Sequence, residues 1–181
     1  MLSIDIKPRE FFNEKTSEFI TVKGGILKLE HSLVSISKWE SKWKIPFLSE
    51  KKKTIAQIDD YIRCMSINGE PDQYLISSIT PQDKDRIIDY IDEKRTATWF
   101  TGMDEKKTSR SEIITSERIY FWMIQYHIPH EYEKWHLSRL LTLIEICNRE
   151  NTPPKQMTQA EIIARNKALN AERKARLHSR G

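Results

Sequence analysis

The sequence TSERIYFWMIQYHIPHEYEKWHLSRLLTLIEICN, residues 115–148, decides the fold. Residues 119–124 are all apolar, so a helix there is apolar on every side and is expected to be surrounded by other elements as a central helix. Pro129 stops it, because proline cannot continue a helix and disfavours helical dihedrals in the residue before it. In the second half, polar residues recur every three or four positions, which predicts a helix with one polar stripe. We therefore expect a helical hairpin that supplies the largest share of the core.

Length and charge indicate one domain with a basic appendage. The chain has 181 residues, 38% of them hydrophobic, which is enough for a single real core. The formal net charge is +4. Residues 158–181 contain six Lys or Arg and two Glu, and six minus two is also +4, so residues 1–157 sum to zero. The basic character belongs to the tail and says little about the partners of the body.

The sequence predicts a soluble, cytoplasmic protein. The first ten residues carry charge within five positions and contain no apolar stretch of signal-peptide length. The longest uncharged apolar-rich run, residues 119–128, is about half of the roughly 20 residues that a membrane-spanning helix needs. Cys64 and Cys147 lie in helical apolar patterns and are expected to be reduced core thiols rather than a disulfide.

Turn and capping signals divide the body into elements. Residues 19–30, FITVKGGILKLE, predict a β-hairpin about Gly24-Gly25, because paired glycines supply the positive φ of a two-residue turn. Two strands alone are marginal in water, so this hairpin should lean on helices or on a second copy of the chain. Helices are predicted after N-caps at Ser32, Thr54 and Thr80, with a short helix or turn in residues 71–78.

A linker follows the body. Pro153 and Pro154 cannot continue a helix, so residues 151–157 are predicted to separate a helical body, residues 1–150, from a tail, residues 158–181. Thr158 and Glu161 have the spacing of a capping box that opens a basic helix. The predicted fold class is mainly α: a compact helical domain with a short N-terminal β-hairpin and a C-terminal basic helix.

No pattern of residues predicts catalysis, a metal or a cofactor. His127, His130 and His136 match no metal-ligand spacing and are expected at an interface or on a polar stripe. Cys147 lies on an apolar face, where burial disfavours a thiolate nucleophile. Carboxylate pairs such as Asp59-Asp60 are expected on solvated helix faces, and the five glycines form no phosphate-binding loop. The residues by themselves therefore indicate no catalytic, metal-binding or nucleotide-binding chemistry.

Two regions are candidates for binding a partner. Trp39 and Trp43 lie one helical turn apart; core packing is the preferred interpretation, and an exposed aromatic anchor is the alternative. The basic tail favours a protein partner over nucleic acid, because it lacks the aromatic residues that stack on single strands. The candidate partner-binding residues are Trp39, Trp43, Phe47, Arg165, Lys167, Arg173, Lys174 and Arg176.

Several segments together resemble a known family. They are LEHSLVSISKWESKWKIPFL (29–48), TIAQIDDYIRCM (54–65), ATWF (97–100), IYFWMIQYHIPHEYEKWHLSRLLTLIEICN (119–148) and IIARNKALNAERKARLHSRG (162–181). In these segments, which span most of its length, the chain resembles the tail assembly chaperones of long-tailed bacteriophages. The resemblance implies a non-enzymatic protein in the cytoplasm of the host bacterium that binds the tape measure protein during virion morphogenesis, without a cofactor.

Two other functions stay open alongside the chaperone. The chain could be a structural component of the virion tail or neck, or a small nucleic-acid-binding protein that acts through its basic tail. The client of the chaperone is expected to meet the Trp39 and Trp43 region, and the tail helix to engage the client or another tail protein. Self-association is a further possibility.

Overall fold

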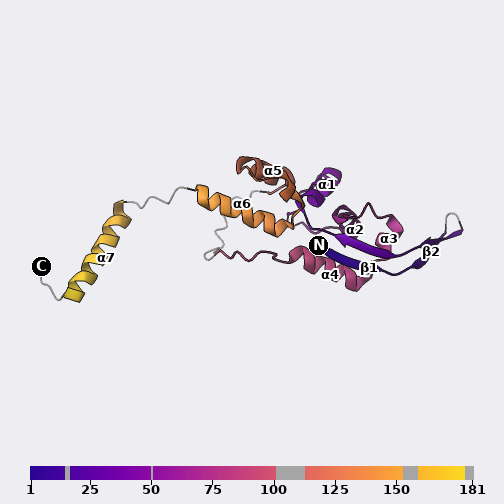
Figure 1. The fold of residues 1–181 in the computed structure, drawn as a ribbon, viewed down its shortest axis with the longest axis horizontal. Helices are drawn as coiled ribbons and strands as arrows, with labels where there is room; N and C mark the ends of the chain where they lie inside the picture. The colour runs from indigo at the N-terminus through magenta and orange to yellow at the C-terminus, as the bar shows by residue number, and fades with distance from the viewer. Residues whose placement is uncertain (15–16, 50, 101–112, 153–158, 178–181) are drawn as a thin grey trace. The chain divides into compact units, whose positions relative to one another are not determined.

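The computed structural model describes residues 1–14, 17–49, 51–100, 113–152 and 159–177 (Figure 1). The chain divides into two compact units, Met1–Cys147 and Asn148–Gly181. The described residues are mainly α-helical, which confirms the predicted fold class at that level. The predicted linker and the capping box at Thr158 fall largely outside the described residues.

The first unit begins with a long antiparallel ribbon. Strand β1 (Leu2–Ile6) pairs with β4 (Gly25–Leu29), and β2 (Arg9–Asn13) pairs with β3 (Glu18–Val22). Leu2 lies opposite Leu29 and Arg9 opposite Val22, so residue numbers sum to 31 in both pairings (2 + 29 and 9 + 22). The two pairings are therefore one ribbon in a single register with a break in the middle, and Figure 1 shows its β2 end extending beyond the helices.

Gly24 and Pro8 make this break. Gly24 has φ +57°, and a Cβ on it would lie 2.4 Å from the carbonyl oxygen of Ile6 and 2.8 Å from the nitrogen of Pro8. Only glycine fits so close to a neighbouring backbone in this conformation, and Pro8 has no N–H to give to a ladder. The predicted hairpin within residues 19–30 is thus wrong in its pairing. Its strands exist, but each pairs with an earlier strand, and the glycines break the ribbon instead of turning it.

Four helices follow the ribbon, each opened by a side-chain cap. They are α1 (Leu33–Trp43), α2 (Ile55–Met65), the short α3 (Gln73–Ser77) and α4 (Pro81–Asp92). Ser32, Thr54 and Thr80 each accept a hydrogen bond from the backbone N–H three residues later, which confirms the three predicted N-caps. Thr54 and Gln57 form the reciprocal capping box that the sequence indicates.

Helix α5 (Ser116–Gln125) ends before Pro129 can stop it. His127 has φ 54°, its N–H donates to the carbonyl of Ile124, and the N–H of Ile128 donates to Met123. This is a Schellman motif with a histidine at the left-handed position, where glycine is the usual residue. A 3₁₀ turn, η1 (His130–Lys134), then leads into α6 (Leu137–Asn151). Both helices of the predicted hairpin are thus present, with a different stop signal between them.

The core of the first unit lies between the ribbon and the helices. Its fully buried side chains include Ile4, Leu29, Leu33, Ile36, Trp39, Ile62, Ile87, Ile119 and Leu140. Helix α5 is not the predicted central helix, because it buries Ile119 and Met123 but leaves Phe121 55% and Ile124 76% exposed. Helix α6 buries one face, with Leu137, Leu140 and Ile144, instead of most of its girth. An apolar face of α5 therefore remains on the surface of the unit.

The second unit contains helix α7 (Gln159–Leu177). Its described side chains are exposed, including Ile162, Ile163 and Leu169. A lone helix with so little burial gains little from packing.

Candidate partner-binding groove

The structure places the three aromatic candidates differently from one another. Trp39 is fully buried, and its indole N–H donates to the carbonyl of Gln57 over 2.9 Å. Trp43 is half-buried and donates to Asp60 Oδ2 over 2.8 Å. The alternative of an exposed anchor is therefore wrong for Trp39, which belongs to the core as the preferred interpretation has it. Phe47 is buried as well, but it lines a groove described below.

The basic candidates all belong to the second unit. Arg165, Lys167, Arg173, Lys174 and Arg176 lie on α7, and each side chain is exposed. Their role in binding a partner stays a prediction.

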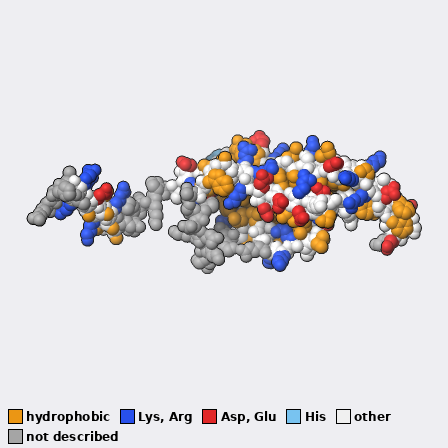
Figure 2. Space-filling view, turned by 90° about the horizontal axis from the view of Figure 1, so that it is seen from below, with side chains coloured by type: hydrophobic (Ala, Val, Ile, Leu, Met, Phe, Trp, Pro, Cys, Tyr) orange, Lys and Arg blue, Asp and Glu red, His pale blue; other side chains and the backbone are white. Residues whose placement is uncertain are grey.

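A concave apolar surface lies between α2, α4 and α6. This hollow of about 500 Å³ is called here the α2–α4–α6 groove. It is lined by His31, Phe47, Leu48, Lys53, Ile58, Tyr61, Ile88, Ile91, Asp92, Lys94, Leu137, Ser138 and Leu141. Figure 2 looks onto the side of the molecule on which α4 lies in Figure 1, and shows hydrophobic side chains among charged ones there. Monomeric proteins seldom leave large apolar surfaces uncovered unless they bind something.

The groove has a buried floor and exposed apolar walls. Its floor includes Phe47 and Tyr61, whose ring centroids lie 4.0 Å apart. On the walls, Ile88 is 46% and Leu48 38% exposed. Ile58, Ile91 and Leu141 are half-buried. Apolar side chains that are partly in water gain free energy when a partner covers them.

Charged groups line the same groove. Lys53 Nζ lies 4.5 Å from the centroid of the Phe47 ring, and burial lowers the pKa of this lysine. Lys94 Nζ lies 5.9 Å from the Trp99 ring centroid. Asp92 contributes the only acidic side chain among the lining residues. The floor is therefore apolar, while two ammonium groups and one carboxylate surround it.

A buried polar cluster supports the floor. His31 Nδ1 and the Tyr61 hydroxyl share a hydrogen bond of 2.5 Å, and the Ser35 hydroxyl lies 3.2 Å from the same oxygen. Burial raises the pKa of Tyr61. Burial, together with the neighbouring His136, lowers the pKa of His31 to about 3. Both groups are thus neutral near pH 7 and fix the floor by hydrogen bonding.

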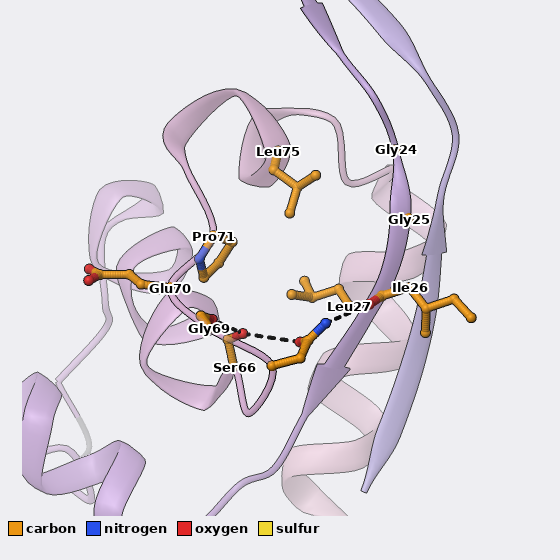
Figure 3. A pocket seen from close by; sticks show the side chains of 10 residues that line it. Gly24, Gly25, Ile26, Leu27, Ser66, Gly69, Glu70, Pro71 and Leu75 are labelled. Carbon is orange, nitrogen blue, oxygen red and sulfur yellow. Dashed lines mark hydrogen bonds between the residues drawn. The ribbon is translucent and has the colours of Figure 1, made fainter.

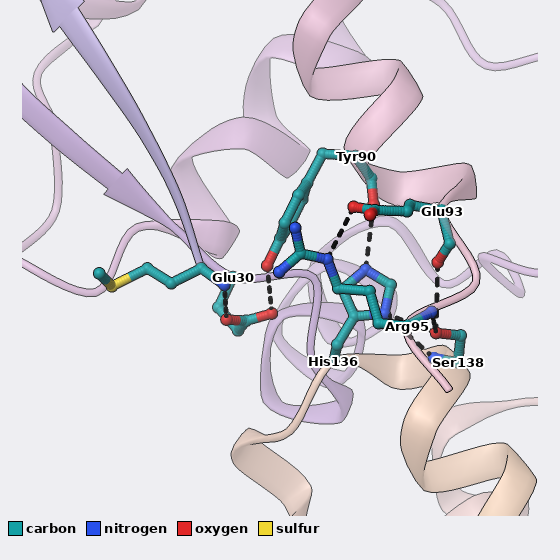
Figure 4. Close-up of polar contacts among 7 residues, drawn as sticks. Glu30, Tyr90, Glu93, Arg95, His136 and Ser138 are labelled. Atoms are coloured by element: carbon teal, nitrogen blue, oxygen red, sulfur yellow. Dashed lines mark hydrogen bonds and ion pairs between the residues drawn. The ribbon is translucent and has the colours of Figure 1, made fainter. Parts of the chain in front are cut away.

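A clamp of hydrogen bonds joins α4 to the start of α6 at the end of the groove (Figure 4). The Tyr90 hydroxyl donates to Glu30 Oε1 over 2.6 Å, and the amine of Met1 lies 2.8 Å from Glu30 Oε2. His136 Nε2 donates to the carbonyl of Tyr90 over 3.0 Å. The other ring nitrogen, Nδ1, is therefore the acceptor, and the Ser138 hydroxyl lies 2.8 Å from it. The clamp thereby fixes the distance between α4 and the start of α6, which form two walls of the groove.

Arg95 extends the clamp. Its backbone N–H donates to the Ser138 hydroxyl over 3.1 Å, and its guanidinium pairs with Glu93 at 2.7 Å. The same guanidinium carbon lies 4.5 Å from the centroid of the Tyr90 ring. The residues that follow α4 are thus held against the first turn of α6 (Figure 4).

A second hollow lies beside β4, and it is better explained as part of the fold (Figure 3). It has a volume of about 370 Å³ and includes Gly24, Leu27, Pro71 and Leu75 in its lining. Within it, Asn68 Nδ2 donates to the carbonyl of Ile26 over 2.8 Å, and the N–H of Lys28 donates to Asn68 Oδ1 over 3.2 Å. The Asn68 amide therefore pairs with the edge of β4 that faces away from β1, as another strand would.

The described parts of the chain allow a metal site, the two thiols and a membrane-spanning helix to be assessed. Within them, no group of three or more His, Cys, Asp or Glu side chains could hold a metal ion. Burial raises the pKa of Cys64 to about 11, so this thiol stays protonated near pH 7. Cys64 and Cys147 are not bonded to each other. Among the described helices, none combines the length and hydrophobicity needed to cross a membrane.

The chain matches no protein-family model, and no curated protein or solved structure matches it. The groove and the resemblance of the sequence segments are therefore the observations that bear on its function.

We expect acid to destabilise the first unit through His31. The pKa of His31 is about 3 in the folded protein, whereas an ordinary histidine, as in the unfolded chain, has a pKa of 6.5, so the unfolded chain binds more protons between these values. The free energy of unfolding therefore falls as the pH falls through this window. From pH 7 to pH 5 this histidine alone should remove about 2 kcal/mol. Denaturant unfolding at both pH values measures the loss.

A titration of the His31 ring by NMR provides the control for this prediction. A midpoint well below the ordinary histidine value of 6.5 is expected, because protonation would place a charge in a buried site. A His31 midpoint close to 6.5 would contradict the prediction.

Proposed function

We propose that this protein is a non-enzymatic tail assembly chaperone of a long-tailed bacteriophage, which binds an amphipathic helical segment of the tape measure protein in the α2–α4–α6 groove. The groove is the observation that carries the proposal, because it is a concave apolar surface held open by fixed walls. The resemblance of the segments described above to tail assembly chaperones supplies the identity of the client.

The groove has the features with which proteins bind helices. A bound amphipathic helix places side chains at positions i, i+3, i+4 and i+7 into an apolar depression between helices. Here Phe47 and Tyr61 form an aromatic floor, and Ile88 on α4 faces the solvent beside it. Because the clamp of Tyr90 and His136 fixes the walls beforehand, little free energy is needed to form the site on binding.

Helix α5 offers a second apolar surface for a long client. Phe121 and Ile124 are 55% and 76% exposed, and Ile113 is 62% exposed. A tape measure protein is expected to be a long helical chain, and binding at more than one place would strengthen its attachment through a high effective concentration. We therefore assign the α5 face a supporting role in holding the client.

Co-expression with the tape measure protein of the same phage tests the proposal. Wild-type chain should co-purify with the client, and the double variant Leu48→Asp/Ile88→Asp should lose at least about 30-fold in affinity, as for central anchors of an interface. Both side chains are exposed, so the variant should unfold close to the wild-type temperature. Affinity capture and thermal unfolding measure the two effects.

A matched control uses exposed isoleucines outside the groove. Ile26 and Ile67 are 59% and 56% exposed, and Ile26→Asp/Ile67→Asp makes the same chemical change near the ribbon. This variant should capture the client like the wild type. Equal capture by the groove variant would refute the groove as the client site.

Retention of the chain in purified virions would favour a structural component over a chaperone, and a salt-dependent gel shift with DNA or RNA would favour the nucleic-acid function.

A further inference from the structure

The charges around the groove define the client segment more closely. We propose that the groove selects a helix whose apolar stripe is flanked by Asp and Glu side chains. This inference rests on the proposed function, because it concerns the same groove and specifies the chemistry of its ligand.

Two lysines of the groove have no acidic partner among the described residues. The ion pairs of that part of the chain include neither Lys53 nor Lys94. Lys53 lies over the Phe47 ring and Lys94 near the Trp99 ring. Both ammonium groups can therefore pair with a carboxylate of a ligand, and no ion pair with a described residue has to break first.

The position of Lys53 makes an acidic ligand favourable. This side chain is half-buried against an aromatic floor, and burial lowers its pKa because the ammonium loses part of its hydration. A carboxylate at hydrogen-bonding distance restores that lost interaction, since charge-assisted hydrogen bonds are the stronger kind. Basic side chains of a ligand would instead meet a like charge.

The net charge of the residues that line the groove is positive, like that of Lys53. Among its lining residues, Lys53 and Lys94 stand against Asp92, which gives two minus one, or +1. Lys51 and Lys52, which precede Lys53, are both exposed and add to the positive potential nearby. Complementary potentials speed the encounter of partners and suppress wrong ones. A segment rich in Asp and Glu is therefore the ligand that the groove favours.

The basic tail of the chain is a poor ligand by the same criterion. Helix α7 exposes Arg165, Lys167, Arg173, Lys174 and Arg176, which carry the same charge as Lys53 and Lys94. Repulsion between like charges would oppose its binding in the groove of a second copy of the chain. The groove is therefore suited to an acidic client and not to the tail.

Two synthetic peptides test this inference with full-length protein. Both form an amphipathic helix with the same Leu and Ile stripe, flanked by Glu in one peptide and by Lys in the other. The Glu peptide should bind wild-type protein at least tenfold more tightly at about 50 mM salt, and the preference should shrink at about 500 mM salt. In Lys53→Glu/Lys94→Glu the preference should be abolished or reversed. Fluorescence anisotropy measures the dissociation constants.

The control variant changes two lysines of the ribbon. Lys7→Glu/Lys23→Glu alters the net charge by the same amount at exposed positions outside the groove. It should keep a tenfold preference for the Glu peptide. Equal binding of both peptides to wild-type protein, with loss of both in Leu48→Asp/Ile88→Asp, would overturn the acidic preference and leave the proposed groove standing. Binding of neither peptide would overturn both.

Discussion

Replacement of Trp39 by alanine is expected to lower the free energy of unfolding by about 3 to 5 kcal/mol. Trp39 is fully buried, and its ring meets Phe47 edge-on with centroids 5.2 Å apart. Alanine would leave a cavity that the surrounding side chains can fill only in part. It would also remove the donor that satisfies the carbonyl of Gln57. Denaturant unfolding with one spectroscopic probe measures the change.

The exposed Trp99 provides the matched control. Its side chain is 74% exposed, so Trp99→Ala should change the stability by no more than about 0.5 kcal/mol. Similar losses for the two variants would contradict the assignment of Trp39 to the core. Any loss of client capture in Trp39→Ala would follow from unfolding, so the exposed residues of the groove are the ones that test binding.

Replacement of Glu40 by alanine is expected to cost about 3 kcal/mol of stability. This carboxylate is 7% exposed and accepts hydrogen bonds from the backbone N–H groups of Phe47 and Ser116, each over 2.7 Å. The Ser116 hydroxyl donates to the same carboxylate over 2.5 Å. Alanine would leave these buried donors without an acceptor, and hydrogen bonds to a charged group are worth more than neutral ones.

Loss of the Glu40 carboxylate would affect the start of a helix that is distant in the sequence. Ser116 is the first residue of α5, so the carboxylate on α1 satisfies an N–H group at the start of a helix 76 residues later in the chain. It also interacts favourably with the positive end of the α5 dipole. Chemical denaturation of Glu40→Ala and of the control Glu70→Ala, an exposed carboxylate, measures the difference. Equal stability of the two variants would contradict this role.

Local signals in the sequence predicted the helices well. Ser32, Thr54 and Thr80 cap their helices because the side-chain oxygen and the N–H that it satisfies are only three residues apart. The ribbon depends on partners far apart in sequence. Leu2, Ile4 and Ile6 alternate with polar residues, which is a strand pattern, but the Gly24-Gly25 pair suggested a nearer partner for β4.

The groove could not be predicted from helical periodicity alone. Ile87 and Ile88 are neighbours, and adjacent residues of a helix point about 100° apart, so both cannot face the same core. The structure buries Ile87 and leaves Ile88 46% exposed. Leu140 and Leu141 divide in the same way between the core and the groove. Such apolar pairs indicate a second apolar surface, but only the structure shows that residues of α2, α4 and α6 make this surface concave.

For helix α5 the sequence predicted more burial than the structure shows. Its six consecutive apolar residues indicated a helix surrounded by the chain, but the described parts of the chain cover only one of its faces. A fully apolar helix predicts that every face tends to be covered, without saying by which molecule. The exposed Phe121 and Ile124 are therefore consistent with contact to another protein.

The constant register of the ribbon has a consequence for folding. Pairing of β2 with β3 closes a short loop, since Asn13 and Glu18 are only five positions apart. Once it has formed, β1 and β4 are already aligned in the same register and can pair with little further loss of chain entropy. The break at Pro8 and Gly24 thus separates a local pairing at the tip from a pairing that packs on the hydrophobic core, and we expect the core pairing to stabilise the ribbon as a whole.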